Sequence, residues 1–480
     1  RTFNTGITVT TFPLSFLIMT IDADFFKNRQ KNYLHFDYPM QPQKIYNYVT
    51  NPKNIEKHAF YPFIHFELKS RKIKKDRTKI IRVRGKKNRY AIVKCVPKIR
   101  PIKYSSHIDG HIYAYYAALL TPNYEKLLEE SNLSDSVLAF RKLPNSPNNI
   151  HFAKKVFEEI KLRQNCVALC FDIKSFFDEL DHQILKKAWL KVLNVNFLPR
   201  DHYQVYKSLT KFSYVNKKDV YNALELSVNK NHKDLKRLCS SHDFRNKIRK
   251  NNLIIKEDKT KGIPQGSAIS AFLSNIYMLD FDKNIKNYLS KLNASYYRYC
   301  DDILIICDSD LGMKIALESE KRIKQLKVQI HPDKTKRVYF QDGLHIYDKP
   351  HMSRESLQYL GFTYNGKKIL LRDTGLAQYH HKASKAIRMT NKKFLKINES
   401  RIKRDDHPLQ LNKKHIYRRF SYIGKRNYIS YALKAAKIMN EPSINKQIKS
   451  HWKRLQAKIK LHEEFNNEYF IYICDEKQNL

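Results

Sequence analysis

The spacing of apolar residues predicts a chain in which short strands alternate with amphipathic helices. Residues 167–173 (VALCFDI) are an apolar run typical of a strand, and the segment after Phe177 predicts a helix with Leu180, Ile184 and Leu185 on one side. Residues 296–307 (YYRYCDDILIIC) contain two strand-like runs around a polar tip, which indicates a hairpin.

The rest of the central region follows the same pattern. Helices are predicted at 105–130 and 313–326, a turn leading into a long amphipathic helix at 261–289, and strands at 334–340 and 356–371. This order is compatible with an antiparallel sheet backed by helices, so we expect an α+β fold.

Two segments combine this periodicity with strong positive charge. Residues 69–100 carry fifteen Lys and Arg against the single Asp76, and β-branched residues on both sides of a turn at Gly85 predict a basic β-hairpin. Residues 382–460 carry twenty-three Lys and Arg against four acids, and apolar residues at helical spacing predict a basic helical bundle.

The remaining segments are less regular. Residues 19–66 predict a helical amino-terminal extension, and 186–260 a long polar connection with helical stretches. Residues 461–480 form an acidic and aromatic tail, expected to pack onto the basic helices by charge complementarity. Residues 1–18 are interpreted as a leader or read-through segment before Met19; a secretion signal is the weaker alternative, because no small-residue cleavage site follows.

Composition narrows the class of protein. The chain has 480 residues with 91 Lys and Arg against 46 Asp and Glu, a formal net charge of +45. A field this positive attracts polyanions, above all nucleic acid. The seven cysteines include no CxxC pair, which indicates a reducing compartment without a disulfide framework or zinc ribbon. No apolar run is long enough to predict a membrane span.

Acidic residues between apolar strand runs are the strongest candidates for chemistry. Asp301 and Asp302 occupy the tip of the predicted hairpin, and Asp172 follows the apolar run 167–171. A carboxylate between apolar strand runs destabilises the fold unless a cation binds it. Three that converge on hard cations would meet the requirement of two-metal phosphoryl transfer, whereas an exposed turn with two acids is the simpler interpretation.

A glycine-bounded turn is a further candidate. Gly262-Ile263-Pro264-Gln265-Gly266 predicts a sharp turn before a helix, whose amino end favours phosphate and whose Gln265 amide can hydrogen-bond a ligand. A plain helix-entry loop is the alternative interpretation of this turn.

These motifs together resemble a known family. FDIKSFF, GIPQGSAIS, YCDD and LQYLGF follow one another as the palm motifs of reverse transcriptases do, over roughly residues 75–375. The resemblance implies a right-hand polymerase fold with an antiparallel palm sheet and a helical thumb. The fingers would span 67–165, the palm 166–375 and the thumb 376–460.

The resemblance also implies a catalytic set. Asp172, Asp301 and Asp302 would bind two Mg²⁺ ions, or Mn²⁺, and the backbone carbonyl of Ile173 would supply another metal ligand. Lys334 matches the residue that protonates pyrophosphate, although Lys336 competes for this role.

Nucleotide and primer contacts follow in the same way. Phe177 matches the steric gate against the ribose 2′-hydroxyl, with core packing as the alternative role. Gln265, Lys98 and Arg100 would hold the incoming deoxynucleoside triphosphate. The segment Leu360-Gly361-Phe362 resembles the primer grip, or else is an ordinary strand with a turn.

Within the family, the chain resembles bacterial defence-associated reverse transcriptases of the abortive-infection and unknown groups. Residues 100–120 and the YLHFDYP segment resemble the type 2 and type 9 systems, which use a non-coding RNA as template or scaffold and make repetitive or homopolymeric DNA. A cytoplasmic location in bacteria follows from this resemblance. The primer and the oligomeric state, a homo-oligomer included, stay open.

Four other functions remain as alternatives. They are a template-independent or protein-primed DNA polymerase, a retron-like reverse transcriptase, an RNA-dependent RNA polymerase and a non-enzymatic RNA-binding scaffold. Phe177 disfavours the RNA polymerase, and intact Asp172, Asp301 and Asp302 argue against the scaffold, because an unused acid cluster destabilises a fold. No VTG signature of retron enzymes occurs in residues 340–440.

Overall fold

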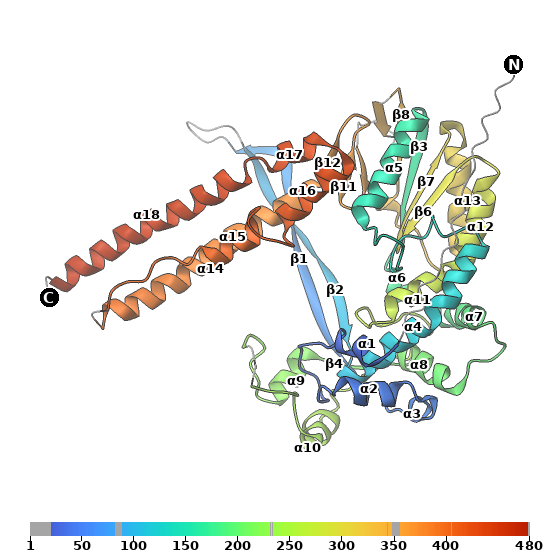
Figure 1. Ribbon diagram of the computed structural model, residues 1–480, viewed down its shortest axis with the longest axis horizontal. Coiled ribbons are helices and arrows are strands. Elements are labelled where there is room, and N and C mark those ends of the chain that lie inside the picture. Colours follow the sequence, from blue (N-terminus) through green and yellow to red (C-terminus); the bar gives the residue numbers. More distant parts are fainter. Residues whose placement is uncertain are drawn as a thin grey trace.

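A five-stranded antiparallel sheet, the palm sheet, lies at the centre of the right-hand part of Figure 1. The computed structural model describes residues 21–81, 89–230, 232, 234–342, 344–347, 356–404 and 406–478; the leader at 1–18 and the turn at Gly85 lie outside them. The strands are ordered β6-β7-β3-β8-β9, namely β6 (Ser295–Tyr299), β7 (Asp302–Cys307), β3 (Cys166–Asp172), β8 (Lys336–Gln341) and β9 (Leu344–Tyr347). All neighbours are antiparallel, which confirms the predicted sheet.

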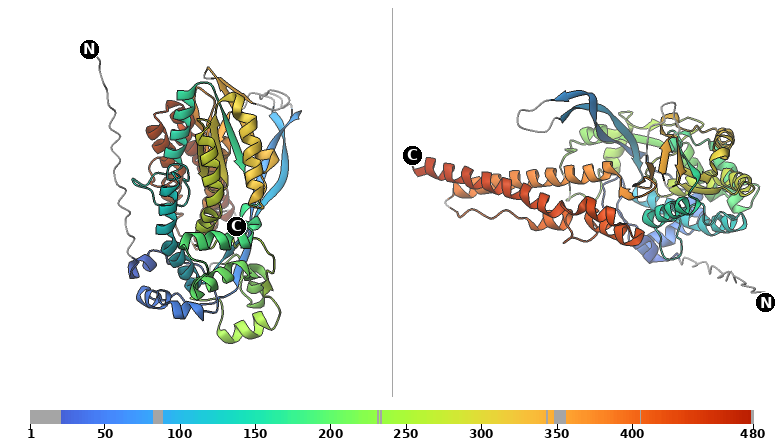
Figure 2. Two further views of the ribbon diagram at one scale, coloured as in Figure 1. Left: turned by 90° about the vertical axis from the view of Figure 1, so that its right-hand side faces the viewer. Right: turned by 90° about the horizontal axis from the view of Figure 1, so that it is seen from above.

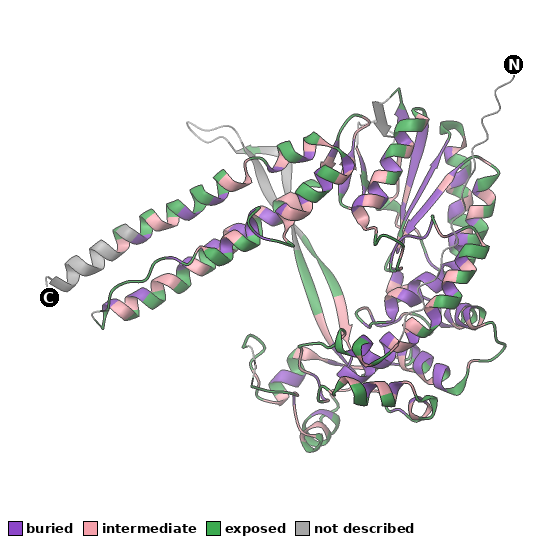
Figure 3. Ribbon diagram, viewed as in Figure 1, coloured by how far each residue is buried: buried purple, intermediate pink, exposed green. Residues whose placement is uncertain are grey.

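Both faces of the palm sheet are buried, which explains why its strands are continuously apolar. Val167, Leu169 and Phe171 face one core with α11 (Ser270–Tyr277), α12 (Leu279–Ser290) and α13 (Gly312–Gln325). Ala168 and Leu304 face a second core with α5 (Asn149–Arg163) and a small sheet of β10 (Leu357–Tyr359), β11 (Phe362–Tyr364) and β12 (Ile369–Leu371). Figure 3 shows this region as the most continuously buried part of the chain.

The predicted basic hairpin is present and is long. β1 (Phe63–Ile81) and β2 (Arg89–Tyr104) pair antiparallel and cross the space between the palm sheet and the carboxy-terminal helices (Figure 1). The connection 186–260 contains helical stretches, as predicted, and also two short strands that the sequence analysis did not predict. Its β4 (Ser213–Asn216) pairs parallel with β1, and β5 (Ile255–Lys256) pairs with β4, through long-range contacts that local pattern does not reveal.

Helices surround the base of this hairpin. The predicted amino-terminal extension forms α1 (Ala23–Lys27), α2 (Pro42–Val49) and α3 (Pro52–Glu56), of which α2 packs on α4 and α3 on α8. The helix predicted at 105–130 is confirmed as α4 (His107–Glu130). The connection supplies α8 (Arg200–Thr210), α9 (Lys217–Ala223), α10 (Ser241–Asp243) and a π-helical turn at Phe244–Arg249.

Two predicted helices are interrupted in the structure. The segment after Phe177 forms α6 (Phe176–Glu179) and α7 (His182–Leu193), because the Asp181 carboxylate accepts the amides of Gln183 and Ile184 and starts a new helix. The long helix predicted within 261–289 breaks at Met278 into α11 and α12. Leu180 and Leu185 are nevertheless buried as expected.

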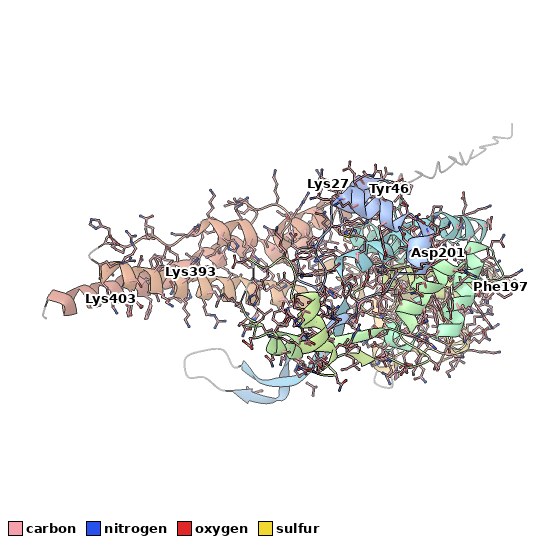
Figure 4. The ribbon with its side chains drawn as sticks, turned by 90° about the horizontal axis from the view of Figure 1, so that it is seen from below. Lys27, Tyr46, Phe197, Asp201, Lys393 and Lys403 are labelled. Carbon is pink, nitrogen blue, oxygen red and sulfur yellow. The ribbon has the colours of Figure 1, made fainter. Side chains whose placement is uncertain are left out.

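The carboxy-terminal helices form an arm that projects from the body of the molecule (Figures 1 and 2). It comprises α14 (Asp373–Ile402), α15 (Lys414–Phe420), α16 (Tyr428–Met439), α17 (Pro442–Ile448) and α18 (His451–Gln478). Lys393 and Lys403 lie far along it in Figure 4. α18 runs through the predicted start of the tail at 461, and its Glu463 pairs with Lys413 at 2.6 Å, in keeping with charge complementarity.

Within the described part of the chain, no helix combines the length and the apolar character that crossing a bilayer demands. The fold is therefore an α+β right-hand arrangement, with a palm sheet, a projecting helical arm and a long basic hairpin that crosses the space between them (Figure 1).

A buried ion pair anchors the β6–β7 hairpin to α12. Arg298 and Asp282 are both fully buried, and the guanidinium donates to the two carboxylate oxygens at 2.7 and 2.5 Å. Tyr296 donates to the same carboxylate at 2.6 Å, and Arg298 also donates to Asn275 at 3.0 Å. Because all three guanidinium nitrogens and both carboxylate oxygens are hydrogen-bonded, the pair offsets much of its desolvation penalty and fixes the hairpin on the helix.

The variant Asp282→Asn is expected to lower the free energy of unfolding by about 3–5 kcal/mol, because it leaves the Arg298 charge buried without a counter-charge. Urea unfolding followed by circular dichroism measures this loss. The matched control is Asp280→Asn, two residues away on α12, which breaks an exposed ion pair with Lys191. It should cost less than about 1 kcal/mol. Equal losses in the two variants would contradict the anchoring role.

Candidate active site

Asp172 and Asp302 meet across two neighbouring strands of the palm sheet. They form the last pair of the antiparallel β3–β7 ladder, directly opposite one another. Residues alternate between the faces of a strand, so both side chains share the face of Ala168 and Leu304, toward the small sheet β10–β12. Directly opposed residues have Cβ atoms about 4.5–5.5 Å apart, which brings the two carboxylates together.

Asp301 lies in the turn beside this pair. Tyr299 pairs with Asp302, so Cys300 and Asp301 form a two-residue hairpin turn, in which Cys300 has a φ of +61°. Such a left-handed conformation suits a tight hairpin but is unfavourable for a residue with a side chain. Arg298 donates to the Cys300 carbonyl at 3.1 Å. The buried ion pair therefore also holds the turn that carries Asp301.

The carboxylates are close enough to perturb one another. Partial desolvation, followed by the charges of Asp301 and Asp172, raises the pKa of Asp302 to about 6. The Asp302 side chain still reaches solvent, so this desolvation comes from protein around an open site rather than from full burial. A positive charge that bound here would relieve the repulsion.

Lys334 partly fulfils this requirement. It ends a short 3₁₀ turn (Pro332–Lys334), and its ammonium group forms an ion pair with the Asp172 carboxylate. The turn is fixed next to β3 because the amide of His331 donates to the Asp172 carbonyl at 2.7 Å. The structure thus brings the predicted Lys334 to the acids; the competing Lys336 pairs with Cys170 in the β3–β8 ladder.

The Ile173 carbonyl takes no part in the pairing of its own segment with Ile330. Ile173 forms an isolated antiparallel bridge with Ile330, flanked by hydrogen bonds from His331 to Asp172 and from Lys174 to Gln329. Neither of these two bonds uses the carbonyl of Ile173, which therefore faces away from Ile330.

The predicted gate and the glycine-bounded turn lie together. The carbonyl of Phe177 accepts the amide of Ile263 at 2.9 Å, and Leu180 accepts that of Gly262 at 2.8 Å. The Phe177 ring is partly buried against Phe176 and the core, so part of the ring packs in the interior and part stays exposed. The two motifs lie far apart in the sequence, so the local pattern does not reveal their contact.

The same turn docks on the basic hairpin. The carbonyl of Gln265 accepts the Lys103 amide at 2.9 Å, and a Cβ at Gly266 would stand 2.8 Å from the Lys103 carbonyl. Lys98 and Arg100 lie on exposed β2, opposite Ser70 and Leu68. At about 3.3 Å per residue they are roughly 10–17 Å along the strand from Lys103, whose amide is bonded to the turn.

The predicted primer grip is a tight turn between β10 and β11. Leu360 and Gly361 have φ values of +45° and +93°. The side-chain amide of Asn149 donates to the Leu360 carbonyl at 3.0 Å and to the Tyr431 hydroxyl at 2.8 Å. The turn is thereby tied both to α5 and to the helical arm.

Three site residues were not identified from the sequence. Arg298 could have been noticed as a charge inside an apolar strand run. Lys103 lies 5.2 and 5.3 Å from the ring centres of Tyr214 and Phe212, and burial lowers its pKa. Arg372 follows β12, and its charge counters the rise in the pKa of Asp302. Nothing in the local pattern indicates the contacts of Lys103 with these two rings or the effect of Arg372 on Asp302.

The expected convergence of three metal-binding carboxylates is only partly present. Among the described residues, no group of three or more His, Cys, Asp and Glu side chains is arranged to hold a metal ion. The donors here are nevertheless all oxygen atoms, which suit hard cations. In this structure the Asp172 carboxylate is instead paired with Lys334.

Comparison with known proteins adds a family and distant relatives. The family model described as "Reverse transcriptase (RNA-dependent DNA polymerase)" matches residues 86–364. The retron Se72 reverse transcriptase of Salmonella heidelberg (strain 579083-10) is 26% identical over 132 residues, which cover 25% of this chain and 35% of that protein. The chain thus matches about a third of the length of this curated relative.

Solved structures with a distant likeness are telomerases. Apo telomerase from Candida tropicalis, truncated from its C-terminal domain, has a TM-score of 0.36 at 12% identity, covering 62% of this chain and 57% of that one. Telomerase from Candida albicans in complex with a TWJ fragment of telomeric RNA has a TM-score of 0.34 at 14% identity, covering 85% and 56%.

The raised pKa of Asp302 predicts a pH dependence of stability without metal. The folded protein holds a proton on Asp302 up to pH about 6, whereas the unfolded chain releases it near 3.8. Lowering the pH from 7 to 5 should therefore raise the contribution of this group to the free energy of unfolding. Urea unfolding in EDTA, compared between wild type and Asp302→Asn, isolates the effect. Identical pH dependence in both proteins would contradict the raised pKa.

Proposed function

The chain belongs to the reverse transcriptase family, and from this we propose that it is an RNA-directed DNA polymerase whose active site contains Asp172, Asp301 and Asp302. The observation that carries the proposal is the direct pairing of Asp172 with Asp302, with Asp301 in the adjoining turn, inside the region that the family model matches. Carboxylates crowded at a solvent-accessible strand end favour phosphoryl-transfer chemistry over a purely structural role.

The residues fit a pair of divalent cations in their chemistry. The three carboxylates and the Ile173 carbonyl would hold them, and Mg²⁺ is the expected ion, with Mn²⁺ as a substitute. When bound, the ions would activate the primer 3′-hydroxyl and neutralise the leaving pyrophosphate. Asp172 would have to exchange its ion pair with Lys334 for this purpose.

The reaction forms a bond between the primer 3′-oxygen and the α-phosphorus of a deoxynucleoside triphosphate, and breaks the bond from that phosphorus to the β-phosphate oxygen. The 3′-hydroxyl loses its proton, and pyrophosphate leaves. Lys334, beside Asp172, is suited to donate a proton to the pyrophosphate. Lys98 and Arg100 would bind the triphosphate, Gln265 the nucleotide, and Phe177 would exclude a 2′-hydroxyl.

The parts of the chain take corresponding roles in this proposal. Residues 67–165 would serve as fingers, 166–375 as palm and 376–460 as thumb, while Leu360, Gly361 and Phe362 would hold the primer end. The product is DNA and the template RNA. The arm with its exposed Lys and Arg residues would track a nucleic acid duplex.

We further propose that this polymerase acts with a non-coding RNA in defence of bacteria against phage, making repetitive or homopolymeric DNA. The named relative is a retron reverse transcriptase, and the net charge of +45 favours a stable RNA partner. The same relative supports a retron-like reverse transcriptase as the second candidate. Sequencing of co-purified RNA and of the DNA product would separate the two.

The double variant Asp301→Ala, Asp302→Ala should reduce deoxynucleotide incorporation at least about a thousandfold, because charge stabilisation at the reacting phosphorus is lost. The assay is primer extension by the full chain on an RNA template with Mg²⁺. Asp280→Ala removes an exposed acid from α12 and should leave incorporation unchanged. Retained activity in the double variant would overturn the proposed site.

The gate assignment makes a separate prediction. Phe177→Ala should raise incorporation of ribonucleotides relative to deoxynucleotides about tenfold or more, because the ring no longer meets the 2′-hydroxyl. Phe177→Tyr keeps the ring and should keep the selection. Single-nucleotide incorporation with each sugar measures the ratio. Unchanged exclusion in Phe177→Ala would show that the ring serves core packing alone.

A further inference from the structure

A surface that includes none of the predicted site residues combines exposed aromatic rings with unpaired positive charges. It is formed by α7, α8 and the loop 194–199 that joins them, and we call it the α8 surface. In Figure 4, Phe197 of this loop lies at the end of the molecule opposite Lys393 and Lys403 of the arm. The α8 surface is therefore separate from the arm, to which the proposed function assigns a nucleic acid duplex.

Apolar and aromatic side chains gather on the α8 surface. Phe197 is 85% exposed, Tyr203 47% and Val195 40%. Single exposed apolar residues are normal on a protein surface. Here, however, all three occur in one loop and the first turn of the helix that follows it. Such a concentration indicates a surface that another molecule covers.

The ring of Tyr203 is presented by a helix that is fixed to its neighbours. α8 packs on α3 and α4. The side-chain amide of Gln204 donates to the His58 carbonyl at 2.9 Å, and the indole of Trp189 on α7 donates to His202 at 3.2 Å. Because the helix is already ordered, a ligand that stacks on Tyr203 pays little for ordering the protein.

Positive side chains surround this ring. Along α8, Arg200, Tyr203 and Lys207 occupy positions i, i+3 and i+7, so they share one face of the helix. The ammonium group of Lys186 on α7 lies 6.0 Å from the centre of the Tyr203 ring. Arg200, Lys207 and Lys186 form no ion pair with any residue that the structure describes. Their charges are therefore free to meet an anionic ligand.

Acidic groups do not balance these charges. Residues 182–211 contain six Lys and Arg, and Asp201 is their only acid. Asp201 is 8% exposed, and its carboxylate accepts the Tyr116 hydroxyl at 2.6 Å in the interior. Of the six basic residues, Lys191 alone has an acidic partner in the described part of the chain, Asp280. The α8 surface therefore attracts a polyanion.

Exposed rings beside unpaired positive charges match a single-stranded nucleic acid. Unpaired bases stack on aromatic faces, while Lys and Arg bind the phosphates of the backbone. A duplex is a poorer match, because its bases stack on one another inside the helix and offer no face to Phe197 or Tyr203. An apolar protein partner is also a poorer match, because it would leave the positive charges without counter-charges.

We propose that the α8 surface binds an unpaired segment of RNA outside the template duplex. Phe197 and Tyr203 each stack on a base, and Lys186, Arg200 and Lys207 bind the phosphates around them. The identification of this strand as part of the polymerase's RNA partner rests on the proposed function, which directs the product duplex to the arm at the opposite end of the molecule.

The test measures binding of a fluorescein-labelled oligouridylate of about twelve nucleotides to the full chain, by fluorescence anisotropy in EDTA. A saturating unlabelled DNA primer on an RNA template first occupies the palm and the arm. Phe197→Ala and Tyr203→Ala should each weaken binding of the oligouridylate about tenfold, because each removes one stacked base. Tyr203→Phe keeps the ring and should bind as wild type does.

The phosphate contacts are tested through salt. Lys207→Gln should lower the slope of log affinity against log salt by about 0.7, the value for one contact on a single strand. The matched controls lie on other helices. Leu162→Ala removes an 84% exposed apolar side chain from α5, and Lys283→Gln removes an exposed charge from α12. Neither control should change the affinity or the slope.

Three results would overturn the proposal. The first is equal affinity of wild type, Phe197→Ala and Tyr203→Ala for the oligouridylate. The second is binding of oligodeoxythymidylate of the same length about tenfold more tightly than the RNA, which would assign the surface to DNA. The third is a lower molar mass of Phe197→Ala in light scattering with unchanged RNA affinity, which would assign the ring to a contact between copies of this chain.

The binding assay separates this inference from the proposed function, because it requires no synthesis. If oligouridylate binding depends on Phe197 and Tyr203 but wild type extends no primer, the polymerase proposal fails and the RNA-binding surface stands. If wild type extends the primer and the two alanine variants bind oligouridylate as wild type does, the polymerase proposal stands and this inference fails.

Discussion

Mutual repulsion among three carboxylates is the constraint around which this site is organised. Asp172 and Asp302 are held opposite one another by the β3–β7 ladder, and Asp301 is held by a turn with a left-handed residue. That geometry persists because Arg298, paired with Asp282 in the interior, also binds the Cys300 carbonyl of the turn. A fully satisfied buried pair thus supports an exposed cluster that is unfavourable by itself.

Positive groups approach the cluster from separate parts of the chain. Lys334 comes from the segment that follows α13 and pairs directly with Asp172. Arg372 comes from the junction of the small sheet and the arm, and its charge acts on Asp302. On the opposite side, the Gln265 turn is bonded both to the Phe177 loop and to β2. A movement of the long basic hairpin would therefore also displace the Gln265 turn and the segment around Phe177. The acids lie where these elements meet, as a site that must bind a triphosphate and a nucleic acid end requires.

The sequence predicted those features that depend on short-range pattern. The buried strand ending in Asp172, the hairpin carrying Asp301 and Asp302, and the basic hairpin at 69–100 are all present, because their periodicity and turn residues are local. The parallel pairing of β4 with β1 was missed, since it joins residues about 150 positions apart. Arg372 was missed for the same reason, because an exposed arginine after a strand looks like any surface residue until the fold brings its charge within range of Asp302. Lys103 was missed because its contacts with the Phe212 and Tyr214 rings join distant parts of the sequence. Arg298 is different, because a charge inside an apolar strand run is a local signal of a buried partner.

The claim that RNA instructs DNA synthesis at these acids is tested most directly by template swapping. The purified chain, freed of co-purifying RNA, is given one DNA primer annealed to RNAs whose single-stranded templates are runs of one nucleotide, and incorporation of each deoxynucleotide is measured. The account predicts that the incorporated nucleotide changes with the template and follows complementarity, and that synthesis stops when RNA is omitted. The same nucleotide incorporated on every template, or undiminished synthesis without RNA, would contradict it.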